Sequence, residues 1–541
     1  MNIRITAVFV VCFFCASGFS EDDSVDIEVT RRQTAVTLNY CRAALHRIRR
    51  NPNKSVFIEE QRRILNNLNL SKIADSEVIT LYRTVLDEIS QIEVSERDRR
   101  IIAEQFRQGT QRQLGASFVV IGAQLATGQI GNVIQTGANS WWDYRNQEVR
   151  RDADIWKINR MKLNSVMTHS STFLNSFWKL SRSNNIPDSW LVRDQDLDQL
   201  ATVLREPDKD RRLRMLQRLE RFMTCYPPYW YYVARTLQST GRLAEAVQTY
   251  RRLIEIGNGH FRQDDMLAGS LANMALIQEV RGEPEAPRLA LKISEHSIRN
   301  WEANLVSAWV LGRHAQHRAA EDLILCNLDD QLETSQSTIA LVSLYYHSGD
   351  RIRLAKLLQD RRVVSAVPIP GLLLCARLLG SDDLPGPASN RLVSSLKAEY
   401  RPGIRGAVVV LRAAAGWKLQ DSHPQIALAG AQSVSAEFRQ TAGDVIAEFK
   451  LDTTDGRRTD YQTDLTLQYP GIPRVRMTLS PPAGVSEGRS GRTIGSGPRL
   501  RVALEVNVIE VDGVRLSLNA GKQKQTSVQG AAIEKSEPVK L

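Results

Sequence analysis

The chain has 541 residues, of which 42% are hydrophobic and 24% charged, so it is too long for one hydrophobic core and too apolar for a disordered chain. Its net charge of +11 comes from 71 Lys and Arg against 60 Asp and Glu. Acidic residues interrupt the basic ones, and no basic run alternates with aromatic residues, so we expect no nucleic-acid partner.

Residues 1–20 are typical of an export signal. Arg4 supplies the positive end, an apolar stretch runs from Ile5 to Phe14, and small residues follow before the acidic Glu21. The apolar stretch is shorter than a membrane span requires, which favours cleavage over anchoring. We therefore expect 1–20 to be a signal peptide and the protein to be exported, to the periplasm or cell envelope.

Residues 21–112 are predicted to form an N-terminal helical domain. Its first apolar stripe has the alternating spacing of three and four residues that is typical of one helix face. The stripe consists of Leu38, Cys41, Leu45 and Ile48. No residue pattern in this domain indicates catalysis.

Residues 113–183 form a predicted unit with a glycine-rich apolar start and a long helix. The run 113–142 has no charged residue, and it ends in aromatic residues followed by arginines, an order typical of a membrane interface. Its amide side chains, among them Gln124 and Asn132, are costly in lipid and favour a buried helical hairpin instead. Both interpretations stay open. The helix 146–183 has imperfect heptads that indicate either internal packing or a homodimer contact.

Residues 184–380 are predicted to form helical hairpins, of which the stretch from Pro227 to Ile256 is the best defined. Trp230 opens its first helix, and Gly241 is placed to make the tight turn into the second. Small residues stand where the two helices would cross, and an aromatic residue lies on the inner face of the second helix. These residues are Ala234, Ala246 and Tyr250.

This stretch resembles a tetratricopeptide repeat. Three neighbouring stretches keep parts of the pattern, and several stacked hairpins are what such a solenoid needs to bury a continuous core. They are Leu271–Ile293, with Pro287 in place of the small alanine, Trp301–Leu328, without a turn glycine, and Leu341–Leu358. The resemblance predicts a mainly α fold with a TPR-like α-solenoid in the middle of the chain.

The resemblance also implies a concave groove that holds an extended protein or peptide partner. By carry-over from the family, Tyr231, Arg235 and Gln238 of the first hairpin would face the ligand, with Asn273 of the second hairpin beside them. Asn273 would bind the peptide backbone and Arg235 a carboxylate. An alternative, held with even weight, is that the tyrosines of this helix pack between hairpins.

The C-terminal part differs in pattern. Residues 381–430 read as a mixed connecting segment that starts with a loop-like run, and 431–520 as a small antiparallel β domain with alternating apolar residues. The Asp512-Gly513 pair between two alternating runs predicts a β-hairpin. The polar residues 521–541 are predicted to be a disordered tail.

No pattern in the chain indicates catalysis, a cofactor or a metal site. His314, His317 and Glu321 have spacing that fits one helix face, but two solvated histidines are far commoner than a metal site. Four widely spaced cysteines follow the signal, and buried thiols are favoured over disulfides: Cys41, Cys225, Cys326 and Cys375.

We therefore predict a non-enzymatic, exported scaffold that binds a protein or peptide partner through the TPR-like groove. The first alternative is an envelope protein that inserts or packs the segment 113–142 on a membrane. The second alternative is an enzyme of a type that these motifs do not identify.

Overall fold

A computed structural model of the chain describes two long stretches and several shorter ones. The described residues are 21–50, seven positions between Val56 and Thr80, 177–403, 406–428, 434–441, 444–451, 463–469, 473–480 and 502–517. They fall into two compact units, divided after Leu267. The predicted signal peptide, the segment 113–142 and the C-terminal tail lie outside the described residues, as does the helix 146–183 apart from Phe177–Ser183.

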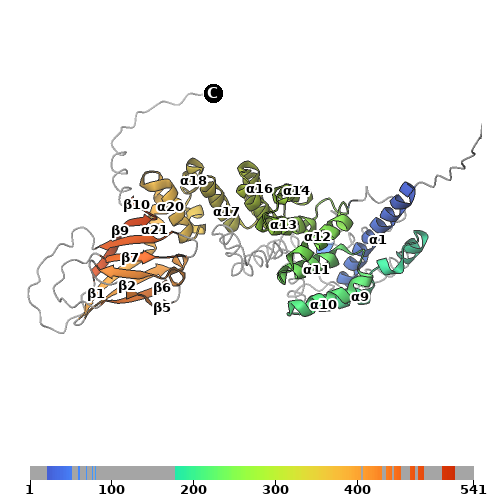
Figure 1. The fold of residues 1–541 in the computed structure, drawn as a ribbon, viewed down its shortest axis with the longest axis horizontal. Helices are drawn as coiled ribbons and strands as arrows, with labels where there is room; N and C mark the ends of the chain where they lie inside the picture. Colours follow the sequence, from blue (N-terminus) through green and yellow to red (C-terminus); the bar gives the residue numbers. More distant parts are fainter. Residues whose placement is uncertain are drawn as a thin grey trace, which may run out of the picture. The chain divides into compact units, whose positions relative to one another are not determined.

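The first unit opens with α1 (Glu21–Arg50), shown in blue in Figure 1. Leu38, Cys41, Leu45 and Ile48 are buried on it, none more than 6% exposed, so the predicted apolar stripe is confirmed. Further helices of this unit follow Phe177. They are η3 (Asp188–Trp190), α9 (Asp194–Val203), α10 (Lys209–Leu219), η4 (Glu220–Phe222), α11 (Pro227–Ser239) and α12 (Leu243–Gly257).

The helices α11 and α12 form the predicted hairpin. Ala234 and Ala246 are fully buried, which lets the two helices cross closely. Gly241 has φ +79°, a left-handed conformation that glycine adopts without strain, and Arg242 N donates to Leu237 O at 3.0 Å to close the turn. The predicted turn at Gly241 is therefore confirmed.

The second unit begins within α13 (Asp265–Val280) and continues as further helical hairpins. The turns after α13, α15 and α17 repeat the same geometry, with a positive φ at Gly282, Ala315 and Gly349. Ala315 shows that the third hairpin makes this turn without glycine. The helices are α14 (Ala286–His296), α15 (Trp301–Arg313), α16 (His317–Asp329), α17 (Thr334–His347), α18 (Arg351–Leu357) and α19 (Arg361–Ala366).

The run predicted as a loop after residue 380 is helical instead. It is divided between α20 (Ile369–Asp383) and α21 (Gly386–Ser394). Gly380, with φ +74° and ψ −179°, is not helical, so α20 consists of two helices joined at a kink. The glycine and proline that indicated a loop act here as a kink and as a helix start, because proline fits the first turn of a helix.

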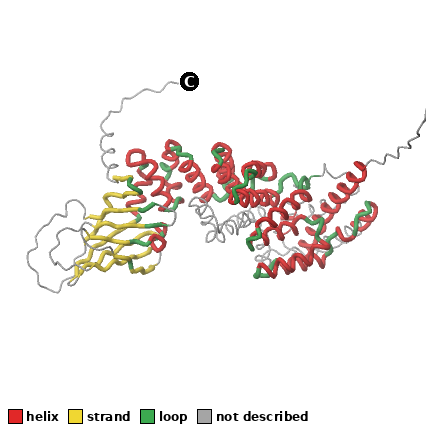
Figure 2. Tube along the Cα trace, in the orientation of Figure 1, coloured by secondary structure: helices red, strands yellow, loops and turns green. Residues whose placement is uncertain are grey.

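The antiparallel sheet begins at Leu396, within the predicted connecting segment, so the predicted start at residue 431 is corrected. Its strands, yellow in Figure 2, follow the order β4-β3-β7-β8-β9-β1-β2-β6-β5, with β10 paired to β9. They are β1 (Leu396–Gly403), β2 (Gly406–Ala414), β3 (Gln425–Leu428), β4 (Val434–Ser435), β5 (Glu437–Thr441), β6 (Asp444–Leu451), β7 (Thr463–Leu467), β8 (Val475–Ser480), β9 (Val502–Val511) and β10 (Val514–Ser517).

The sheet curls until its two ends nearly meet. β4 pairs with β3 at one end of the strand order, β5 pairs with β6 at the other, and only Ala436 separates β4 from β5. Alternate residues point inward and are buried, as along β7 and β8. The predicted hairpin is confirmed, since Asp512 and Gly513 both have positive φ between β9 and β10.

Trp417 links the last helix to the sheet. It is fully buried in the short helix η5 (Ala415–Trp417), and its Nε1 donates to Ser395 Oγ at 2.8 Å, directly after α21. Tyr469 donates its hydroxyl to the Trp417 carbonyl at 2.6 Å. Arg377 of α20 also pairs with Asp512 of the β9–β10 hairpin at 2.5 Å. The helices of the second unit are therefore joined to the sheet by direct polar contacts.

Candidate functional site

Two of the predicted ligand-facing residues on α11 are buried. Tyr231 is 1% exposed, and its ring lies edge-on to that of Tyr250 on α12, with centroids 6.5 Å apart. Gln238 is fully buried, and its Oε1 accepts a hydrogen bond of 2.8 Å from the Tyr250 hydroxyl. Both side chains therefore contribute to the interior of the hairpin.

The other two predicted residues differ in exposure. Asn273 is fully buried on α13, whose residues are buried without interruption from Met266 to Gln278. Arg235 is half-buried, so it is the member of the predicted set that solvent reaches. Asn273 belongs to a different unit from the three residues on α11, and the predicted contact of all four residues with one ligand stays a prediction.

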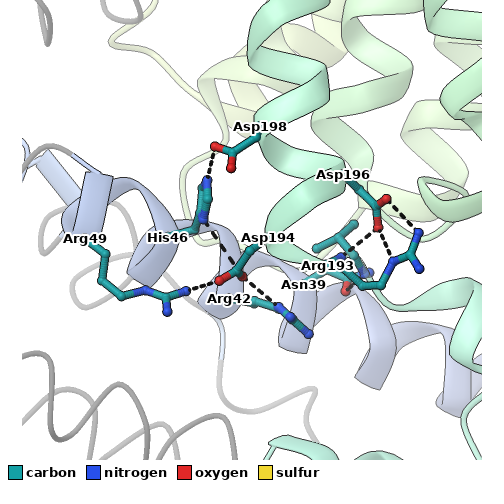
Figure 3. A network of polar contacts seen from close by, with 9 residues as sticks. Asn39, Arg42, His46, Arg49, Arg193, Asp194, Asp196 and Asp198 are labelled. Carbon is teal, nitrogen blue, oxygen red and sulfur yellow. Dashed lines mark hydrogen bonds and ion pairs between the residues drawn. The ribbon is translucent and has the colours of Figure 1, made fainter.

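A polar cluster between α1 and α9 was not predicted from the sequence. Figure 3 shows His46 of α1 between two carboxylates of α9, with arginines of α1 around them. His46 Nε2 lies 3.1 Å from Asp198 Oδ1, and Arg49 Nη2 lies 2.6 Å from Asp194 Oδ2. We call this set the α1–α9 cluster, and its members are Arg42, His46, Arg49, Arg50, Asp194 and Asp198.

Arg42 is the most enclosed cation of the α1–α9 cluster. Its Nε donates to Asp194 Oδ1 at 3.3 Å, and its guanidinium carbon lies 5.1 Å from the ring centre of Phe177 and 5.4 Å from that of Trp178. Such stacking suits the weakly hydrated guanidinium group. The cluster thus holds α1 against α9 and the helix that ends after Phe177.

The pKa values of Asp194, Asp198 and His46 depend on their neighbours in the α1–α9 cluster. Burial opposes ionisation of Asp194, but Arg49 and Arg42 outweigh it, and the pKa of this carboxyl lies below its usual 3.8. The hydrogen bond from Arg50 likewise lowers the pKa of Asp198. Burial lowers the pKa of His46 below its usual 6.5, and the two carboxylates offset only part of this. The arrangement is a set of ion pairs around a neutral imidazole, and it stabilises the packing of α1.

We expect the stability of this packing to fall when the pH drops below about 6.5. The unfolded chain takes up the His46 proton first, because the folded pKa is the lower one. Asp194 and Asp198 remain ionised in this range. His46→Gln should therefore flatten the dependence of the urea midpoint on pH between 7.5 and 5.5. An equal slope in the wild type and the variant would show that His46 does not titrate in this way.

Two of the three residues that were considered as metal ligands, His314 and Glu321, have other partners, whereas His317 Nδ1 is buried without a hydrogen-bond partner among the described residues. His314 Nε2 lies 2.7 Å from Glu279 Oε2, while Glu321 accepts a hydrogen bond of 2.6 Å from the Tyr345 hydroxyl. Arg353 also pairs with Glu321. Within the described ranges, no three His, Cys, Asp or Glu side chains come together as a metal site.

The four cysteines are free thiols, as the sequence favoured. Burial raises the pKa of Cys41 and of Cys375 to about 12, and that of Cys225 to about 11. A thiol is a nucleophile only as the thiolate, so these three residues act as small hydrophobic side chains.

Comparison of the chain with protein-family models, curated proteins and solved structures finds no match. Among the helices that the structure describes, none is long and apolar enough to cross a bilayer. The resemblance to a tetratricopeptide repeat therefore depends on the residues and geometry of this chain alone.

Proposed function

We propose that this protein is a non-catalytic, exported scaffold whose helical hairpins form a TPR-like array that binds a protein partner. The repeated turn supports this proposal. Gly282, Ala315 and Gly349 follow each other at intervals of 33 and 34 residues, and a tetratricopeptide repeat has about 34. After each helix the backbone N–H that follows the turn residue donates to the carbonyl five residues earlier, at 2.9–3.0 Å, from Glu283, Gln316 and Asp350.

Arg235 is the residue through which the proposed partner contacts α11. Arg235 is half-buried on α11, and Gln238 of the same helix accepts a hydrogen bond from Tyr250 of α12. A guanidinium group on a rigid helix binds a carboxylate with little loss of side-chain entropy. In this proposal Tyr231 and Gln238 support the binding surface of α11 from within.

Site-specific photo-crosslinking in the producing cell tests the proposal. We expect a benzophenone side chain at position 235 to give one discrete crosslinked protein. The same group at position 356, where Lys356 is exposed on α18, should give none. Crosslinks of equal pattern at both positions, or none at 235, would contradict binding at α11.

A further inference from the structure

The outer face of α10 carries a row of arginines. The row is hard to recognise in the sequence because acidic residues are interspersed with the arginines of this region. Their spacing of three, four and three residues places them on one side of the helix, which η4 continues. Leu213 and Leu216 are buried on the opposite side. We call this row the arginine stripe, and its members are Arg211, Arg214, Arg218 and Arg221.

Most of the arginine stripe has no carboxylate partner. All four side chains are exposed, and Arg211 pairs with Glu206 at 3.2 Å. Arg214, Arg218 and Arg221 form no ion pair with any residue that the structure describes. The nearby Glu220 pairs instead with Arg252 on α12, at 3.5 Å. Three guanidinium groups thus remain in a line of about 10 Å.

The outer face of the next hairpin differs from that of α10. On α12, Arg252 is paired with Glu220, and its guanidinium carbon lies 3.7 Å from the ring centre of Trp230. At the start of the same helix Arg242 pairs with Glu245. Arg252 and Arg242 are therefore paired with carboxylates of the fold, whereas Arg214, Arg218 and Arg221 are not paired with any carboxylate that the structure describes.

The neighbours of the arginine stripe decide which anion fits it. The exposed residues of α10, with Gln217 between Arg214 and Arg218, are all polar, so this helix has no exposed apolar side chain to enter a membrane. Phe222 is covered by Arg193 at 4.2 Å and by Arg221 at 5.3 Å, so it offers no free face for a base to stack on.

We propose that Arg214, Arg218 and Arg221 bind an acidic polypeptide segment of a partner protein. The Cβ atoms of neighbouring arginines along the stripe are about 5–6 Å apart, as are those of acidic residues three or four positions apart on a helix. Each guanidinium group pairs with one carboxylate, in the two-pronged geometry that lysine does not provide. The arginine stripe does not include Arg235, so a test of the stripe is independent of a test of the proposed function.

Fluorescence anisotropy with a labelled 20-residue Glu/Ala peptide, whose glutamates recur every three or four residues, tests the inference at low salt. The R214Q/R218Q/R221Q chain should bind this peptide about tenfold more weakly, since each exposed ion pair contributes a factor of about two. The matched control is R288Q/R361Q/R362Q, which removes the same charge from exposed arginines elsewhere. The control should bind like the wild type.

Further arms separate the alternatives. The R214K/R218K/R221K chain keeps the charge and should lose about threefold, because lysine lacks the fork. Equal losses in the stripe and control variants, or no binding of the peptide to the wild type, would overturn the inference. Stronger binding to phosphatidylglycerol vesicles or to a single-stranded oligonucleotide, lost in the stripe variant, would also overturn it and assign the stripe to that class. Circular dichroism verifies that each variant is folded.

Discussion

Replacing Asn39 by alanine is expected to lower the free energy of unfolding of the first unit by about 3–5 kcal/mol. Asn39 is fully buried on α1 and bonds three backbone groups from two other segments. Its Nδ2 donates to the carbonyls of Trp190 and Cys225 at 2.7 and 2.9 Å, and its Oδ1 accepts from Val192 N at 3.0 Å. Alanine leaves these backbone groups buried without partners.

Urea unfolding and hydrogen–deuterium exchange of residues 21–50 measure this effect. Asn39→Asp should be about as harmful, because its carboxylate would face two carbonyl oxygens. Gln33→Ala is the control, since Gln33 is exposed on the same helix, and we expect a change within about 0.5 kcal/mol. If Asn39→Ala exchanges and unfolds like the wild type, α1 is not held to this unit by Asn39.

Replacing Trp417 by alanine is expected to destabilise the C-terminal sheet by about 3–5 kcal/mol. The ring is fully buried, so its removal leaves a large cavity between the sheet and α21. The hydrogen bond to Ser395 is lost as well. Thermal unfolding followed by near-ultraviolet circular dichroism should show an earlier transition for this part of the chain.

Two variants calibrate this result. Trp417→Phe keeps most of the apolar volume and should cost about 1–2 kcal/mol, mainly for the lost hydrogen bond and imperfect packing. Phe438→Ala removes an aromatic ring that is 38% exposed on β5 and should cost less than Trp417→Ala. Equal losses for Trp417→Ala and Phe438→Ala would show that the region around Trp417 repacks.

The turns and the apolar face of α1 were predictable because each depends on residues that are close together in the sequence. Gly241 and the Asp512-Gly513 pair adopt the positive φ that their types favour, and Leu38 and Cys41 keep one buried face. β1 alternates between buried and more exposed residues over Leu396–Tyr400, but residues 407 and 409–411 of the next strand, β2, are all buried and do not alternate. Such a run is typical of a covered strand and is easily taken for a connecting segment.

The α1–α9 cluster was not predictable, since its two helices are about 150 residues apart in the chain. Arginines and aspartates in mixed sequence are typical of solvated helix faces, and only the packing of α1 on α9 brings Arg42 and Asp194 together. Gln238 shows that a position predicted from a family resemblance can have a different environment in this chain. Its position matched a ligand-facing site of the family it resembles, but the Tyr250 hydroxyl supplies a partner within the hairpin.

The near closure of the sheet has a consequence for how the chain behaves at high concentration. An open sheet has two edge strands whose free N–H and C=O groups recruit strands from other molecules and promote aggregation. Here the segment through β4 and β5 bonds one end with its first residues and the other end with its last. Among the described strands few backbone groups are left to recruit another copy, which lowers the tendency of the sheet to aggregate at high concentration.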